Sequence, residues 1–498
     1  MQLVFHSAET NSHMLKTRIS DRLKRFSFAD SRTAANRYMK KVKWPVTRNL
    51  TTLILIILGS VAFVEFFAPA DLEQSARHAL FILIVAASLW ITESIPPFAV
   101  SFLVIGLAVF FLESAVPLDI TDNWEKYVNT WSSPVIWILL GGFILAIGAQ
   151  ITKFDRKFSR VIIERFGTKP YNLLLGIMLT TGVLSMFISN TATTAMMLTI
   201  ILPFAKQYGK QEPIVKAMML GVAASATVGG IGTVIGSSPN AIALGILQSA
   251  GYEFSFVDWM IPGIPTALIL ILISWYILKR TYKTELTNLD LSIGEEPTPR
   301  ELADRNTTEN RIIVVGTFII TIGLWMTSTI HMIPVAVVSL IPIVIFTAVG
   351  IIQSEEIKLI PWDTLILVAG GLTLGIAIND SGLAAYMVGM IPAFESPFVV
   401  ILMMAIITSL ASNVMSNTAA ASILIPFGAM LVPTEFILLM VVTLGFSAST
   451  ALLLPISTPP NALVFSTNYL KQADFRSVGL IIALVSPFLI VFMLWLLI

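Results

Sequence analysis

The stretch SMFISNTATT, residues 185–194, places serine, asparagine and threonine in succession inside an otherwise apolar segment. A second stretch, SNVMSNTAAA at 412–421, repeats the arrangement S-x-x-x-S-N-T in the other half of the chain. Each of the two is followed further along the chain by a motif that contains proline, GSSPN at 236–240 and STPPN at 457–461. Two matched pairs of this kind indicate an internal repeat.

The composition is typical of a polytopic membrane protein. Of the 498 residues, 56% are hydrophobic and only 12% are charged, whereas soluble domains carry about 25% charged residues. Several stretches approach the roughly 20 apolar residues that a helix needs to span a bilayer. The chain has no cysteine, which excludes disulfides, thiolate metal sites and cysteine nucleophiles. We therefore expect an all-α membrane protein, embedded in the lipid bilayer and without a nucleic-acid partner.

Residues 1–48 form a basic arm ahead of the first apolar segment, with Lys40, Lys41 and Lys43 close to the membrane. Loops rich in lysine and arginine face the cytoplasm, so we place the N-terminus there. The arm could form an amphipathic helix on the membrane surface or be a solvated extension, and the sequence leaves both open. Because a long charged segment precedes the first apolar run, we expect no signal peptide of the ordinary form.

Apolar segments and loop charges together predict eleven spans and two re-entrant hairpins. The hairpins are expected at 171–205 and 397–430, each interrupted in the middle by its S-N-T motif. Two further spans, 213–250 and 432–467, are expected to be broken. The unbroken spans are expected near residues 49–68, 79–95, 97–115, 134–152, 260–279, 311–329, 332–352, 363–383 and 475–498.

A polar linker at 281–310 separates a first half, 49–280, from a second half, 311–498. The halves align through WILLGGFILAIGAQI at 137–151 and ILVAGGLTLGIAIND at 366–380, which share a glycine pair. By the charge pattern the first repeat starts outside and the second starts inside, which puts the C-terminus outside. The sequence therefore predicts an inverted-topology repeat, as in many secondary transporters.

The repeated polar motifs have a specific use within a membrane. A hairpin tip leaves backbone N–H and C=O groups without helical partners, so it must line a polar cavity or be buried in protein. The N–H groups that start the returning helix suit a carboxylate, and oxygens around the same turn suit a hard cation such as Na⁺. Glycines up to Gly236 and prolines from Pro455 interrupt the two broken spans. Two tips facing two breaks would form one site near the midplane.

These motifs and the inverted halves resemble the divalent anion–sodium symporter (DASS) family, which includes the bacterial dicarboxylate transporters of the INDY type. The resemblance covers roughly residues 50–498. It implies a homodimer that works by an elevator-like movement of the hairpin domain against a scaffold. It also implies substrate contacts from both tips and both break motifs, at Ser189, Asn190, Thr191, Ser237, Asn417, Thr418, Thr458 and Pro459.

The same resemblance implies two sodium sites. The first would be built from Ser185, Ser189, Asn190 and Gly236, and the second from Ser412, Met415 through its carbonyl, Asn417 and Ser457. Neither the tips nor the break motifs contain lysine or arginine, so no fixed cation compensates a doubly charged anion there. We therefore expect Na⁺, as the coupling ion, to bind first and complete the anion site.

The resulting prediction is a sodium-coupled symporter in a bacterial inner membrane that imports a C4-dicarboxylate such as succinate, malate or fumarate. Citrate or sulfate as the cargo, and sodium-independent exchange, are the alternatives. An intramembrane enzyme is disfavoured because the chain has no H-E-x-x-H or G-x-S-x-G motif. A channel is disfavoured because the two tips are expected to open to opposite sides of the membrane.

Two acidic residues are given structural roles by the sequence. Asp363 follows a tryptophan at the start of a span, where we expect it to cap the helix. Asp380, next to Asn379, is expected at the membrane interface.

Overall fold

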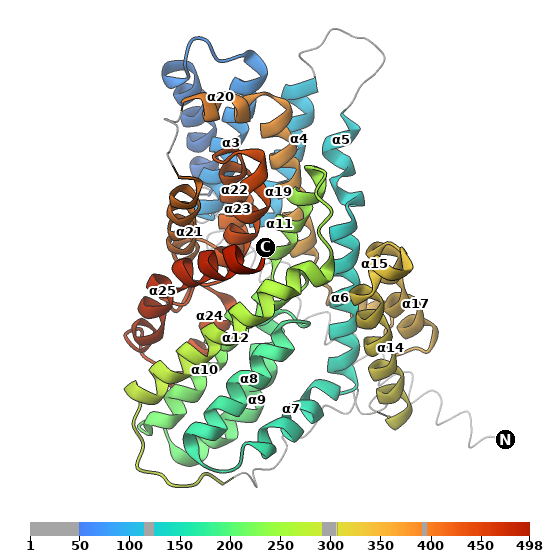
Figure 1. Ribbon diagram of the computed structural model, residues 1–498, viewed down its shortest axis with the longest axis vertical. Helices are drawn as coiled ribbons and strands as arrows, with labels where there is room; N and C mark the ends of the chain where they lie inside the picture. Colours follow the sequence, from blue (N-terminus) through green and yellow to red (C-terminus); the bar gives the residue numbers. More distant parts are fainter. Residues whose placement is uncertain (1–48, 114–123, 291–304, 306, 391–395) are drawn as a thin grey trace, which may run out of the picture. The chain divides into compact units, whose positions relative to one another are not determined.

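The computed structural model describes residues 49–113, 124–290, 305, 307–390 and 396–498, and the regular elements in these ranges are all helical (Figure 1). The chain divides into two compact units, residues 1–59 and 60–498. The described part of the first unit, 49–59, begins the helix Asn49–Phe67, and the elements discussed below belong to the second unit. The arm predicted at 1–48 lies outside the described residues.

Within the described residues, nine helices are long and apolar enough to cross a membrane, which confirms the predicted all-α membrane fold class. The count of eleven spans and the re-entrant hairpins stay predictions. The first half contains α3 (Gln74–Thr92), α4 (Pro97–Ala108), α5 (Glu125–Val128), α6 (Pro134–Ile151), α7 (Phe154–Arg165), α8 (Pro170–Ser185), α9 (Asn190–Tyr208), α10 (Pro213–Gly229), α11 (Ser238–Ser249) and α12 (Phe256–Thr281). The second contains α14 (Thr308–Met326), α15 (Ser328–His331), α16 (Val335–Val338), α17 (Leu340–Ala348), α18 (Ser354–Ile357), α19 (Trp362–Asp380), α20 (Leu383–Met390), α21 (Pro397–Val414), α22 (Asn417–Met430), α23 (Thr434–Ala448), α24 (Pro459–Ser466) and α25 (Asp474–Leu497).

Each S-N-T motif lies where one helix ends and the next begins, between α8 and α9 and between α21 and α22. The serine of each motif is the N-cap of the second helix. Ser189 Oγ accepts a hydrogen bond from Ala192 N at 3.4 Å, and Ser416 Oγ accepts one from Ala419 N at 3.2 Å. A serine N-cap satisfies one backbone N–H that the first turn leaves free, so the motif starts the helix and also exposes the asparagine and threonine that follow.

The two broken spans lose their helical structure at the glycines and prolines. The first break follows Gly229, with a short 3₁₀ turn before α11 begins, and the second spans residues 449–458 between α23 and α24. Buried asparagines hold both breaks. Asn240 Nδ2 donates to Gly230 O and Thr233 O, both at 2.8 Å, and Asn461 Nδ2 donates to Leu454 O at 2.8 Å. These bonds satisfy carbonyl groups that have lost their helical partners.

The short helix that follows the break in each half packs against helices of the other half. Helix α11, from the first half, packs against α22 and α23 of the second, while α24 packs against α9 and α10 of the first. Figure 1 shows this arrangement, with α11 among the helices of the second half and α24 beside α10. Because α9 and α22 follow matching motifs, as do α11 and α24, each half contributes the same part to the other. The breaks before α11 and α24 therefore both lie close to the S-N-T motifs that start α9 and α22.

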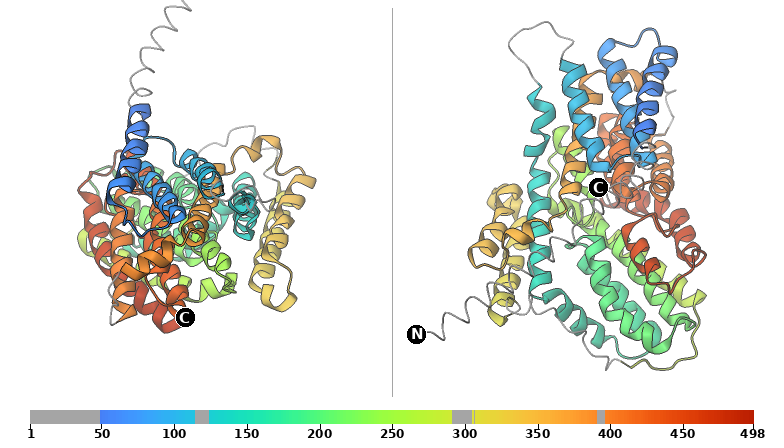
Figure 2. Two further views of the ribbon diagram at one scale, coloured as in Figure 1. Left: turned by 90° about the horizontal axis from the view of Figure 1, so that it is seen from above. Right: turned by 180° about the vertical axis from the view of Figure 1, so that it is seen from behind.

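Matching glycines allow the long helices α6 and α19 to approach other elements closely. A Cβ at Gly141 would lie 2.8 Å from Ser339 Cβ, between α16 and α17, and a Cβ at Gly370 would lie 2.3 Å from Ser101 Cβ of α4. Helices α14, α16 and α17 pack on α6, and they lie beside it in Figure 1 and from behind in Figure 2. Small residues at such contacts are typical of membrane helix packing.

One segment differs from a simple loop, and one residue at a helix end agrees with its expected position. The basic segment after α6, which charge alone marks as cytoplasmic, forms the amphipathic helix α7 and buries Asp155, Ser159 and Ile163. Asp380, at the end of α19, forms an ion pair with Lys126 at 3.0 Å, and both side chains are about one-third exposed. A partly exposed pair at a helix end agrees with the interfacial position expected for Asp380.

Candidate functional site

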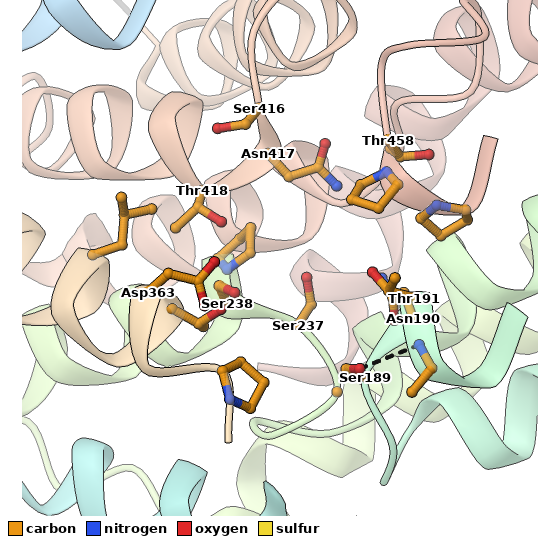
Figure 3. A pocket seen from close by; sticks show the side chains of 18 of the residues that line it. Ser189, Asn190, Thr191, Ser237, Ser238, Asp363, Ser416, Asn417, Thr418 and Thr458 are labelled. Atoms are coloured by element: carbon orange, nitrogen blue, oxygen red, sulfur yellow. Dashed lines mark hydrogen bonds between the residues drawn. The ribbon is translucent and has the colours of Figure 1, made fainter. Parts of the chain in front are cut away.

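A cavity of about 620 Å³ lies where the two tips and the two breaks meet (Figure 3). This volume is within the range of small-molecule sites in proteins. All the residues predicted to contact substrate line this one cavity, namely Ser189, Asn190, Thr191, Ser237, Asn417, Thr418, Thr458 and Pro459. The structure therefore brings together motifs that are far apart in the sequence, and their binding roles stay predictions.

Six helices begin at this cavity, and each contributes a residue of its first turn or its N-cap to the lining. They are α4, α9, α11, α19, α22 and α24. The N-terminus of a helix carries a partial positive charge and backbone N–H groups without helical partners. Lysine, arginine and histidine are absent from the described residues that line the cavity. The helix N-termini therefore supply partial positive charge and backbone donors to a lining whose one ionisable described side chain is the acidic Asp363.

Oxygen atoms converge behind the first tip. Ser185 is fully buried, and its Oγ donates to Ala226 O, near the end of α10, at 2.6 Å and lies 2.7 Å from Asn190 Oδ1. The same end of the Asn190 amide lies 3.0 Å from both Ala226 O and Gly236 O. The amide can complete this cluster in two ways: its nitrogen can donate to these oxygens, or its oxygen can join them around a cation. Carbonyls at helix C-terminal ends favour a cation in such a place.

The second tip repeats this arrangement. Ser412 is also fully buried, and its Oγ donates to Ala448 O, the last residue of α23, at 2.6 Å and lies 2.7 Å from Asn417 Oδ1. The matching bonds of Ser185 have the same lengths. Because the two sets come from different halves, the matched residues of the repeat take up matching geometry as well.

The remaining residues predicted to bind sodium are placed differently. Ser189 Oγ caps α9, and Ser457 Oγ donates to Leu454 O at 2.8 Å, although both residues line the cavity. Met415 lies at the end of α21 with extended backbone angles and does not belong to the described lining of the cavity. Ser185, Asn190 and Gly236 lie together at the first tip, as do Ser412 and Asn417 at the second.

Sequence reasoning missed two kinds of contributor. The carbonyls of Ala226 and Ala448 contact the tip serines through the backbone, which an alanine side chain does not reveal. Asn240 and Asn461 hold the breaks in shape, and here a signal was present. Both are the last residue of the repeated motifs GSSPN and STPPN, so the repeat itself indicated that the two asparagines share a structural function.

Asp363 does not cap α19. The helix begins at Trp362 with Pro361 as the N-cap residue, and there is no side-chain capping bond. Asp363 is therefore inside the first turn rather than ahead of it, and its side chain lines the cavity. The expectation was wrong by two positions, because the N-cap is Pro361 and the helix begins at Trp362, ahead of Asp363.

Comparison with known proteins identifies relatives over most of the chain. The sequence model of a family described as citrate transporters (CitMHS) matches residues 87–445. A sodium-dependent dicarboxylate transporter, SdcS of Staphylococcus saprophyticus, is 32% identical over 488 residues, covering 90% of this chain and 92% of that protein. SdcS of Staphylococcus aureus strain USA300 is 32% identical over 476 residues, covering 88% and 90%.

A solved structure shares the fold at low sequence identity. The YdaH transporter of Alcanivorax borkumensis superposes with a TM-score of 0.51 at 12% identity, over 81% of this chain and 98% of that one. This similarity concerns the fold alone.

Proposed function

Because the chain belongs to the citrate transporter family, we propose that it is a sodium-coupled symporter that imports a small divalent anion, most favourably a C4-dicarboxylate. As a member of this family it is a membrane transporter and not an enzyme. The observation that carries the proposal is the cavity, where helix N-termini converge and the described lining has no basic residue. The names of the related SdcS proteins agree with both the ion and the substrate class.

Sodium supplies the positive charge that the lining lacks. In this mechanism Na⁺ occupies the oxygen clusters behind the two tips, next to Asn190 and Asn417. When Asn190 Oδ1 turns toward the ion, its amide nitrogen is free to face the cavity and donate to a substrate carboxylate. Na⁺ therefore both neutralises the anion and orients its hydrogen-bond donor, which gives the order of binding, Na⁺ first and anion second.

Transport requires the site to face each side of the membrane in turn. We propose that the helix pairs and broken helices move as one body against a scaffold, in an elevator-like manner and within a homodimer. Helix α10 packs on α8 and α9, and α11 packs on α22 and α23. This packing supports a single moving body that contains both tips and both breaks. The proposed location is a bacterial inner membrane with a cytoplasmic N-terminus and an external C-terminus.

Succinate uptake into proteoliposomes tests the proposal directly. With an inward Na⁺ gradient we expect at least about tenfold more uptake than with an equal K⁺ gradient, within the usual range of coupling between ligands. Uptake that is indifferent to Na⁺ would instead favour exchange. Uptake of citrate or sulfate but not succinate would keep the mechanism and change the cargo.

The serines behind the tips provide a test of the cation sites. Replacing Ser185 or Ser412 with alanine removes one oxygen from each cluster, and we expect the Na⁺ concentration for half-maximal uptake to rise about 10- to 100-fold, as for supporting residues at metal sites. Ser274→Ala is the matched control, because among the described residues that buried serine bonds to Leu270 O of its own helix alone, at 2.8 Å. Equal Na⁺ dependence in all three variants would contradict the assignment.

A further inference from the structure

Asp363 is an acidic residue in a cavity that is expected to receive an anion. It lies in the first turn of α19, and Figure 3 shows its carboxylate pointing into the cavity from that helix. Among the described lining residues it is the one side chain that can carry a charge, the others being hydroxyl, amide or apolar groups. The proposed sodium-coupled import does not use it.

The Asp363 carboxylate has no hydrogen-bond or ion-pair partner among the described residues, and the residue is exposed to the cavity. Basic residues near either end of α19 are engaged elsewhere. Lys358 pairs with Glu355 at 2.8 Å, and Lys126 pairs with Asp380 at the far end of the helix. A first-turn carboxylate gains from the dipole of its own helix without any partner, but that gain does not require it to face the cavity.

A fixed negative charge in the cavity changes the binding affinity of different substrates by different amounts. A plain dicarboxylate or sulfate presents only negative charge, so Asp363 repels it. A dicarboxylate that also carries a hydroxyl or an ammonium group can direct that donor to Asp363. A hydrogen bond to a charged acceptor is about twice as strong as one between neutral groups.

We propose that Asp363 is a specificity-determining residue that accepts a hydrogen bond from a donor group on the substrate. The cavity then prefers dicarboxylates substituted with a hydroxyl or ammonium group over unsubstituted ones. The two tips hold the carboxylates, and Asp363 contacts what lies between them. This inference rests on the proposed function, because it takes a dicarboxylate as the cargo.

Competition for radiolabelled succinate uptake in proteoliposomes tests the inference. The competitors are unlabelled succinate, L-malate, L-aspartate and sulfate, all at saturating Na⁺ and near pH ~7.5, where carboxylic acids are ionised. For the wild type we expect malate or aspartate to inhibit at about tenfold lower concentration than succinate, the lower end of what a hydrogen bond to a charged group provides. Malate as the better competitor identifies a hydroxyl, and aspartate identifies an ammonium group.

Asp363→Asn removes the charge and keeps the shape of the side chain. In this variant we expect succinate and sulfate to bind more tightly than in the wild type, since the repulsion is gone. The advantage of the donor-bearing substrate should fall to within about threefold, because a neutral acceptor forms the weaker hydrogen bond. The matched control is Asp380→Asn, on the same helix but outside the cavity lining, which should keep the wild-type order of competitors.

The outcomes separate the two claims. If the wild type takes up succinate with Na⁺ but Asp363→Asn keeps the same ratio of succinate to malate and aspartate, the inference is wrong and the proposed function stands. If the wild type transports none of the four anions with Na⁺, the proposed function fails and the inference with it. The thermal unfolding midpoint of each purified variant, with and without Na⁺, shows whether a loss of uptake comes from a loss of folding.

Discussion

Alanine at Asn190 is expected to abolish sodium-dependent succinate uptake, lowering it by at least about 100-fold. The Asn190 amide lies within 3.0 Å of Ser185 Oγ, Ala226 O and Gly236 O and also lines the cavity. Its loss removes an oxygen from the proposed cation site and a donor from the anion site, and one hydrogen bond to a charged group alone is worth about 1.5–3 kcal/mol. Asn417→Ala should have the same effect, since Asn417 bonds to Ser412 in the same way.

The substitution Asn190→Asp separates the two contributions. The new side chain would keep an oxygen toward the cation cluster but present a carboxylate, not an amide, to the substrate. We therefore expect this variant to keep the stabilisation by Na⁺, measured as a rise in the thermal unfolding midpoint, while losing succinate uptake. Asn379→Ala, at an exposed position near the end of α19, is the matched control and should transport normally. Normal uptake by Asn190→Ala would remove the first tip from the mechanism.

The places where the S-N-T motifs interrupt the helices could be predicted because their chemistry is local. A serine that caps a helix, followed by asparagine and threonine, has few other uses in an apolar segment, and the repeat supplied a second, independent copy. The breaks in the two helices could also be predicted, since Gly236 and the prolines from Pro455 do not favour a continuous helix. These local signals predicted residues that line one cavity in the structure.

The features that the sequence could not predict depend on the exact residue at which a helix begins or on contacts made by backbone atoms. Asp363 was expected to be a cap, but the helix begins two residues earlier than that expectation requires, and Asp363 lies in the first turn as a lining residue. The contacts of Ala226 O and Ala448 O with the tip serines depend on how α10 and α23 pack, and the sequence carries no sign of either. The exchange of α11 and α24 between halves is likewise a tertiary feature, although the repeat implied that both ends would behave alike.

Alanine at Gly236 is expected to be the most damaging single-methyl change at the site. A Cβ there would lie 2.5 Å from Gly230 O and 3.0 Å from both Gly230 Cα and Ser185 O. All three are backbone atoms, so no side chain can rotate away and the break must open instead. Overpacking of this kind costs about 1–3 kcal/mol. The displacement would also move Gly236 O away from Asn190, so we expect Na⁺-dependent uptake to be lost.

The matched control for Gly236→Ala is Gly106→Ala in α4, where no atom lies within 4 Å of the added Cβ. That change should be neutral or stabilise the protein by about 0.4–1 kcal/mol, because alanine restricts the unfolded chain. The Na⁺ dependence of the thermal unfolding midpoint distinguishes the two effects of Gly236→Ala. A variant that folds but is no longer stabilised by Na⁺ places Gly236 in the cation site. A variant that keeps the wild-type response to Na⁺ would show that the oxygen cluster behind the first tip does not bind the coupling ion, and the second tip alone would then have to couple Na⁺ to the anion.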